Sequence, residues 1–161
     1  MKISLEIFLL KIVDHQVCYQ HKYLNLSKKD SDPNILVQSL IQQKFMLPAS
    51  TIQNKFLIHS TSWHYIPPQK IILTYIAYSD ELTFTGKVKK LPIKELRKIN
   101  ISRGNPHSRS GKEKQVVAHA MRHISFLIKT DYRKKFKNVF TPSTKKIFKS
   151  LWISLAGRVA F

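Results

Sequence analysis

Two segments rich in β-branched and aromatic residues, 55–66 and 70–78, are separated only by Pro67, Pro68 and Gln69. This arrangement predicts a β-hairpin, because such residues favour strands and prolines favour turns. The second segment, Lys-Ile-Ile-Leu-Thr-Tyr-Ile-Ala-Tyr, is apolar at nearly every position, as in a strand that is covered on both faces. We therefore expect a small, largely antiparallel sheet in which this hairpin is central.

Hydrophobic spacing predicts one further strand and several helices around the hairpin. Residues 3–13 mix β-branched and aromatic side chains and indicate a first strand, with a helix as the alternative. Asp32 and Pro33 supply a side-chain cap followed by proline, which favours a helix from there to about Pro48. Apolar repeats predict further helical segments at 91–99, 113–129, 132–140 and 141–157. We expect a single α+β domain over 1–161, with the central hairpin 55–78 covered by helices.

Basic residues are concentrated in the second half of the chain. Residues 86–161 hold 20 of the 28 lysines and arginines but only three carboxylates, whereas residues 1–85 hold eight basic and six acidic residues. A strong field of one sign attracts polyanions and raises association rates. With nine acidic residues in all and no pair of them on one element, glycosidase or two-metal chemistry is poorly supported.

The basic half, 86–161, predicts an accessory or binding protein that engages an anionic macromolecule. RNA or a ribonucleoprotein is the expected partner, followed by an acidic protein complex, although the RRM, KH and zinc-finger signatures are absent. Two alternatives remain open: contact of the final helix with a membrane surface, and a solvated lysine-rich surface that reflects compositional drift. The residues expected to bind the anion are Arg103, Arg109, Lys112, Arg122, Arg133, Lys134 and Lys135.

Histidines indicate a second kind of site, with packed, hydrogen-bonded residues of the core as the alternative. His119 and His123 lie four residues apart at the edge of the apolar stripe of the 113–129 helix, so they share one face of it. Regular alternation along the first hairpin arm places His59, Thr61 and Trp63 on one face of the sheet. If the helix packs on this face, the five side chains line one pocket.

The alternative function is therefore a small-ligand-binding protein or an enzyme. His59 with His119 or His123 would transfer protons, and Arg122 would hold an anionic substrate through its planar guanidinium group. Regular alternation excludes His64 from this pocket by placing it on the other face. No metal is assigned, because His-Ala-Met-Arg-His lacks the glutamate of the zinc-protease signature. No cofactor is expected, and a binding protein is favoured over an enzyme.

Three segments of the chain resemble a group of uncharacterised bacterial proteins, including cyanobacterial members. The segments are Ile58-His-Ser-Thr-Ser-Trp63, Ile71-Ile-Leu-Thr-Tyr75 and Val117-Ala-His-Ala-Met-Arg-His-Ile124. In that group a His-Ser-Thr-Ser-Trp strand is paired with an Ala-His-Ala-x-Arg-His helix. No activity is established for the group, so the resemblance implies none. It covers Leu57 to Ile128 and implies one constellation of residues, namely His59, Trp63, His119, Arg122 and His123.

The sequence shows no sign of a membrane span or of secretion. No stretch approaches the roughly 20 apolar residues that a span requires, and Glu6, Lys11 and Asp14 interrupt the apolar start. Cys18 is the lone cysteine, which excludes an internal disulfide and favours a reducing compartment. We expect a cytoplasmic protein.

Overall fold

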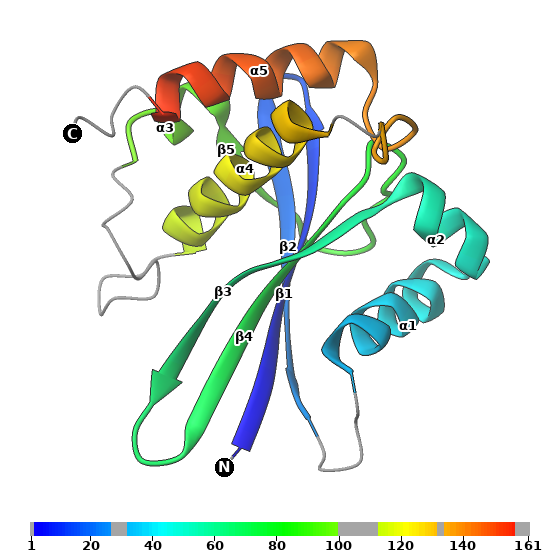
Figure 1. The fold of residues 1–161 in the computed structure, drawn as a ribbon, viewed down its shortest axis with the longest axis vertical. Helices are drawn as coiled ribbons and strands as arrows, with labels where there is room; N and C mark the ends of the chain where they lie inside the picture. Colours follow the sequence, from blue (N-terminus) through cyan, green and yellow to red (C-terminus); the bar gives the residue numbers. More distant parts are fainter. Residues whose placement is uncertain (1, 27–31, 100–112, 132–133, 157–161) are drawn as a thin grey trace.

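The computed structural model of the chain describes residues 2–26, 32–99, 113–131 and 134–156. Within them, five strands form one sheet in the order β3-β4-β1-β2-β5 (Figure 1). The strands β1 and β4 run parallel, and the other three pairings are antiparallel, so the sheet is mixed but largely antiparallel, as expected of the α+β class. The strand bounds are β1 Lys2–Val13, β2 Gln16–Asn25, β3 Leu57–Ile66, β4 Lys70–Tyr78 and β5 Lys89–Pro92.

The predicted hairpin forms, but it lies at one side of the sheet. The strand β4 has β3 and β1 as neighbours, which agrees with its apolar sequence, while β3 is an edge strand. The middle position belongs to β1, whose Leu5, Phe8 and Leu10 are fully buried. The sequence alone did not place β1 there, because its parallel pairing with β4 joins residues 68 positions apart, such as Glu6 and Thr74.

The strand β2 was not predicted. Polar residues Gln20, His21 and Lys22 interrupt its apolar pattern. It is held instead by continuous antiparallel pairing with β1, which begins at a two-residue turn of Asp14 and His15. Both turn residues have positive φ, 47° and 58°, as expected for a tight turn that matches the twist of the strands.

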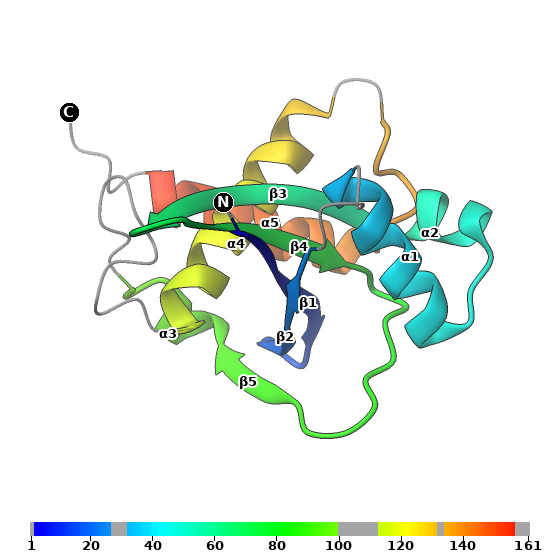
Figure 2. The same ribbon diagram turned by 90° about the horizontal axis from the view of Figure 1, so that it is seen from below.

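Helices cover both faces of the sheet (Figures 1 and 2). The face covered by α1 and α2 is called the α1 face. The helix α1 begins where predicted, because Asp32 Oδ1 accepts a hydrogen bond from the backbone N–H of Asn34 at 2.8 Å. The opposite face, covered by α3, α4 and α5, is called the α4 face. The helices of the α1 face are α1 Pro33–Phe45 and α2 Ala49–Lys55; those of the α4 face are α3 Ile93–Leu96, α4 Glu113–Thr130 and α5 Pro142–Ala156.

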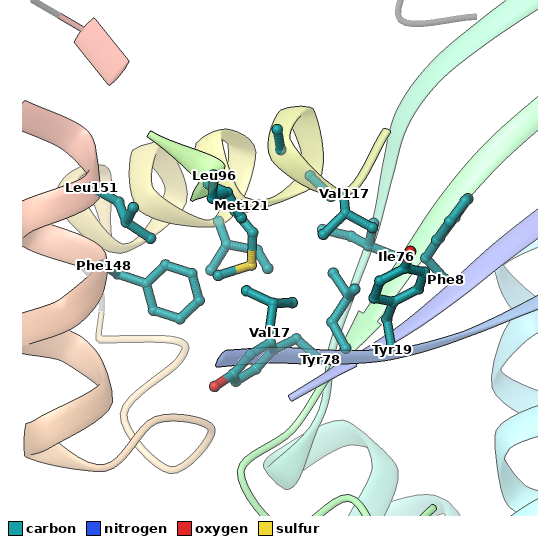
Figure 3. Packing of buried hydrophobic residues seen from close by; sticks show 14 of the residues in the cluster. Phe8, Val17, Tyr19, Ile76, Tyr78, Leu96, Val117, Met121, Phe148 and Leu151 are labelled. Atoms are coloured by element: carbon teal, nitrogen blue, oxygen red, sulfur yellow. The ribbon is translucent and has the colours of Figure 1, made fainter. Parts of the chain in front are cut away.

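The core of the α4 face extends from the sheet to α5 (Figure 3). Tyr78 of β4 extends toward Phe148 of α5, whereas Phe8 of β1 lies beside Tyr19 at the other side of the cluster, and Phe8, Tyr78 and Phe148 are fully buried. The rings of Tyr78 and Phe148 meet edge to face, with centroids 5.4 Å apart. Burial of aromatic surface in this geometry stabilises the docking of α5.

A second core lies on the α1 face. Alternate residues of β1, Ile7 and Leu9 among them, point away from the α4 face and pack against Val37 and Ile41 of α1. Ile52 of α2 completes this smaller cluster. The alternation of β1 therefore supplies both cores from one strand.

Two predicted helical segments were wrong in part. Residues 91 and 92 belong to β5, where Leu91 lies opposite Val17, and α3 is limited to Ile93–Leu96. Of the segment 132–140, the described residues 134–140 form turns and a bend. The Asp131 carboxylate accepts hydrogen bonds there from the backbone N–H groups of Lys135 and Phe136, at 2.7 and 2.9 Å. The helices predicted at 113–129 and 141–157 are confirmed as α4 and α5.

Candidate functional site

Basic side chains of α3 and α5 come together near the middle of α5. Arg97, which caps α3, donates a hydrogen bond from Nη2 to Ser150 Oγ of α5 at 3.0 Å. Lys146 precedes Ser150 by one helical turn and therefore lies on the same side of α5. The surface formed in this way, called the α3–α5 surface, consists of the exposed residues Lys94, Arg97, Lys98, Lys146 and Lys149.

More cations lie before the start of α5, in the turn at 134–137. Lys134, Lys135 and Lys137 are exposed, whereas Phe136 packs on the core. The neighbouring carboxylate of Asp131 is engaged by backbone N–H groups of the same turn. The structure pairs Lys55 with Glu81 and Lys89 with Glu113, and neither pair involves the turn or the α3–α5 surface. Positive charge therefore lies both before the start of α5 and along its middle.

The structure describes only part of the predicted anion-binding set. Lys134 and Lys135 are exposed, and Arg122 of α4 is partly buried beside the histidines. The remaining candidates, Arg103, Arg109, Lys112 and Arg133, lie outside the described residues.

Three of the predicted pocket histidines do meet where α4 packs on β3. The ring centroids of His119 and His123 are 4.5 Å apart, and those of His59 and His123 are 5.5 Å apart. His119 Nε2 lies 3.3 Å from the backbone oxygen of Thr61, which is itself buried. The three imidazoles therefore lie together, but Thr61 joins them only through its backbone oxygen, because its hydroxyl donates a hydrogen bond to the backbone oxygen of Thr74.

Burial keeps these imidazoles uncharged. It lowers the pKa of His59 and, as the largest of several causes, the pKa of His119. The pKa of His123 falls to about 4, first through burial and then through the charges of His119, His59 and Arg122. The lowered pKa values favour the neutral form of all three rings. Within the described part of the chain, no three His, Cys, Asp or Glu side chains are placed to hold a metal ion.

A β-bulge overturns the predicted position of Trp63. Ser60 lies opposite Tyr75 and Ser62 opposite Thr74, so Thr61 is an additional residue in β3. Directly opposed residues share a face, and the extra residue reverses the alternation beyond it.

Beyond the bulge, Trp63 lies opposite Leu73, which packs on the α1 face, and it is 67% exposed. It does not line the histidine cluster. His64, which regular alternation excluded, lies opposite Ile72 on the same face as His59. The outcome for these two residues is the reverse of the sequence-based prediction.

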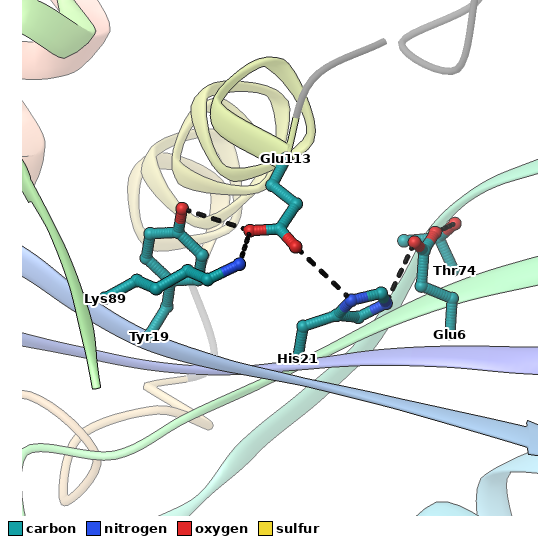
Figure 4. Close-up of polar contacts among 6 residues, drawn as sticks. All are labelled: Glu6, Tyr19, His21, Thr74, Lys89 and Glu113. Atoms are coloured by element: carbon teal, nitrogen blue, oxygen red, sulfur yellow. Dashed lines mark hydrogen bonds and ion pairs between the residues drawn. The ribbon is translucent and has the colours of Figure 1, made fainter. Parts of the chain in front are cut away.

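A polar network that the sequence did not suggest lies further along the α4 face (Figure 4). His21 of β2 stands between two carboxylates: Nε2 is 3.0 Å from Glu6 Oε1, and Nδ1 is 3.7 Å from Glu113 Oε1. Glu113 Oε2 accepts hydrogen bonds from Lys89 Nζ at 2.6 Å and from the Tyr19 hydroxyl at 3.4 Å. Burial, followed by the charge of Glu113 and its hydrogen bond, raises the pKa of Tyr19 to about 12.

Next to this network, a cleft of about 780 Å³ opens at the outer edge of β2. The strand β5 pairs with β2 only as far as Tyr19, so the cleft begins where this pairing ends. Its walls come from β1, β2, α1, the segment before β5, the first residue of β5 and the first residue of α4. Figure 2 shows the segment that joins β4 to β5 running in a wide arc beside β1 and β2. None of the three clustered histidines lines this cleft.

No protein-family model matches the chain, and comparison with curated proteins finds no match. In the described residues, no helix is both long and apolar enough to cross a bilayer. A functional assignment must therefore rest on the geometry given above.

Proposed function

We propose that the protein is a binding protein that engages RNA, free or in a ribonucleoprotein, through its basic C-terminal half. The observation that carries the proposal is the hydrogen bond between Arg97 and Ser150, which joins the cations of α3 and α5 into one surface. Lysines and arginines gathered in this way contact several phosphates at once and release their counterions. The proposal includes a cytoplasmic location.

The placement of the carboxylates supports this proposal. Asp131 is engaged by the backbone of the 134–137 turn, and Asp80 accepts a hydrogen bond from the backbone N–H of Thr141 at 2.6 Å. Asp131 and Asp80 thus stabilise the turn before α5 and the start of α5, whereas Glu95 of α3 is an exposed carboxylate beside the cations of the α3–α5 surface. Against this one exposed carboxylate the α3–α5 surface has five cations, and the excess of positive charge favours a partner that supplies negative charge.

The test is binding of a short, labelled, single-stranded RNA of mixed sequence, followed by fluorescence anisotropy over a range of salt concentrations. Replacing Lys146 and Lys149 by Gln should weaken binding and reduce the slope of log affinity against log salt by about 1.4, since each single-strand phosphate contact contributes about 0.7. The matched control is Lys22→Gln with Lys44→Gln, which removes the same charge from the cleft and should leave the slope unchanged.

Equal effects of the two double variants would show that only total charge matters and would contradict the proposed surface. A partner that is captured from a lysate and retained after nuclease treatment would replace RNA by an acidic protein complex. Binding to anionic vesicles but not to RNA would favour a membrane surface instead.

A second candidate function, a small-ligand site or enzyme at the histidine cluster, is favoured by the ring contacts among His59, His119 and His123. Neutral imidazoles accept protons, and Arg122 is close enough for its charge to lower the pKa of His119 and His123. The test is NMR of the labelled histidines during titration with inorganic phosphate. Selective, saturable shifts at His119 and His123 that Arg122→Gln abolishes would support the site, and unchanged spectra would reject it.

A further inference from the structure

The inner wall of the cleft at β2 is apolar. Ile7 and Leu9 of β1 and Leu24 of β2 form one side, and Leu40 and Ile41 of α1 form the other. A volume near 780 Å³ lies within the range of about 300–1,000 Å³ that small-molecule sites occupy. The wall offers apolar contact area, but it supplies no charge of its own.

The rim of the cleft is cationic. Lys22, Lys44, Lys87 and Lys89 line it, and among the cleft-lining residues that the structure describes the only carboxylate is that of Glu113. This carboxylate lies 2.6 Å from Lys89 Nζ and is therefore neutralised. The other three ammonium groups give the cleft an excess of positive charge next to an apolar wall.

Gln20 holds the rim together. Its side-chain Nε2 donates hydrogen bonds to the backbone oxygens of Thr85 and Lys87, at 2.7 and 3.1 Å, and its Oε1 accepts one from Lys44 Nζ at 2.6 Å. One amide thereby ties β2, the segment before β5 and α1 to one another. The position of the Lys44 ammonium group is fixed before any ligand arrives, which reduces the entropy lost on binding.

Lys22 of β2 lies opposite Ile7, whose side chain packs on the α1 face, so Lys22 projects on the side of the sheet that α1 and its Lys44 cover, and both lysines line the cleft. Burial lowers the pKa of Lys44, and the charge of Lys22 lowers it further. Two neighbouring cations at the mouth of an apolar cleft repel each other, and an anion placed between them would relieve this repulsion.

We propose that this cleft binds a small organic anion, with its apolar body against the isoleucine and leucine wall and its phosphate, sulfonate or carboxylate group between Lys22 and Lys44. This site is separate from the α3–α5 surface and independent of the RNA proposal. The cations alone would bind any anion, and the apolar wall alone would bind any apolar molecule. A cleft that has both selects a ligand with an anionic group and an apolar body.

The experiment is a fluorescence titration of the full chain with 8-anilinonaphthalene-1-sulfonate, an aromatic body that carries one sulfonate. We expect saturable binding at one site. Replacing Lys22 and Lys44 by Gln should weaken it about tenfold or more, as expected for the loss of charge-assisted contacts. Gln20→Ala should weaken it less, because it frees the rim without removing a charge.

Controls separate the cleft from general charge. The Lys146→Gln, Lys149→Gln variant should bind the probe like wild type, and equal weakening by both double variants would overturn the site. 1-Naphthyl phosphate should displace the probe, whereas inorganic phosphate at the same concentration should not, since it lacks the apolar body. Equal displacement by the two phosphates, or no saturable binding, would also overturn it. If the double variant fails to fold by circular dichroism, Lys22→Gln alone provides the test, because it keeps the bond between Lys44 and Gln20.

Discussion

The two faces of the sheet are filled to different extents. Among the described residues, the α4 face buries a cluster of 20 side chains between strands, α3, α4 and α5, whereas the cluster on the α1 face has ten. The larger cluster leaves polar groups at its margin, where imidazoles lose water and their pKa values fall. The smaller one borders the cleft at β2. The comparison indicates that one face is specialised for packing and the other has room for a ligand.

Matched truncations in the two cores should show the largest difference in the free energy of unfolding. Ile124 of α4 and Ile41 of α1 are 0% and 2% exposed. We expect Ile124→Ala to reduce the free energy of unfolding by about 4 kcal/mol and Ile41→Ala by about 2 kcal/mol, because the second change only widens a cleft that solvent already enters. Urea unfolding measures both values. Equal losses would show that the α1 face is as tightly packed as the α4 face.

The next largest difference is expected between the aspartates at the starts of α5 and α1, in the free energy of unfolding that each substitution removes. Asp80 accepts hydrogen bonds from Thr141 N–H, the Tyr78 hydroxyl and the Thr144 hydroxyl, whereas Asp32 accepts one from Asn34 N–H. We expect Asp80→Ala to lower the free energy of unfolding by about 3 kcal/mol and Asp32→Ala by about 1 kcal/mol.

Asn at either position keeps one acceptor oxygen and serves as the control for these two changes. An Asp80→Ala loss no larger than that of Asp32→Ala would remove the distinction between the two helix starts.

Acid should weaken the α4 face through its histidines. The pKa of His123 is about 4 in the folded chain, below its ordinary value of 6.5, so the unfolded state binds the proton more readily. The stability that the folded chain owes to an uncharged His123 is complete above pH 6.5 and is lost as the pH falls toward 4. Since the ring is only partly buried, we expect wild type to lose about 2 kcal/mol more than His123→Gln over this window. Urea unfolding between pH 7.5 and 4 measures the difference, and parallel pH profiles would contradict it.

The smallest effect should come from surface ion pairs. Lys55 and Glu81 approach to 2.7 Å, but their side chains are 39% and 59% exposed. Lys55→Gln should therefore change the free energy of unfolding by less than about 0.5 kcal/mol, and the change should shrink in high salt. Lys89→Gln, next to the less exposed Glu113, is the comparison on the α4 face and should have the larger effect.

Local patterns predicted most of the regular elements. The apolar run of β4, the stripe of α4 and the Asp32-Pro33 start of α1 all depend on neighbours in the sequence, and each formed where expected. The strand β2 could not be predicted in this way, because its polar residues are tolerated only through pairing with β1. The short β5 likewise depends on its pairing with β2.

The candidate sites were predicted less completely. The spacing of His119 and His123 was enough to place both on one face, and the structure brings His59 to them. The bulge at Thr61 exchanges the faces of the sheet on which Trp63 and His64 lie. A single additional residue in β3 moves every later residue of the strand to the opposite face, and the alternation of apolar and polar residues in the sequence does not reveal it.

The sequence by itself determined the helical and strand periods, the charge asymmetry and the pairing of two histidines, because these properties depend on residues close together in the chain. Only the tertiary structure decided that His21 lies between Glu6 and Glu113, that Arg97 joins α3 to α5, and that Gln20 braces a cleft. Each of these contacts joins residues at least 15 positions apart. Their meeting depends on strand order and register, which packing of the whole chain selects.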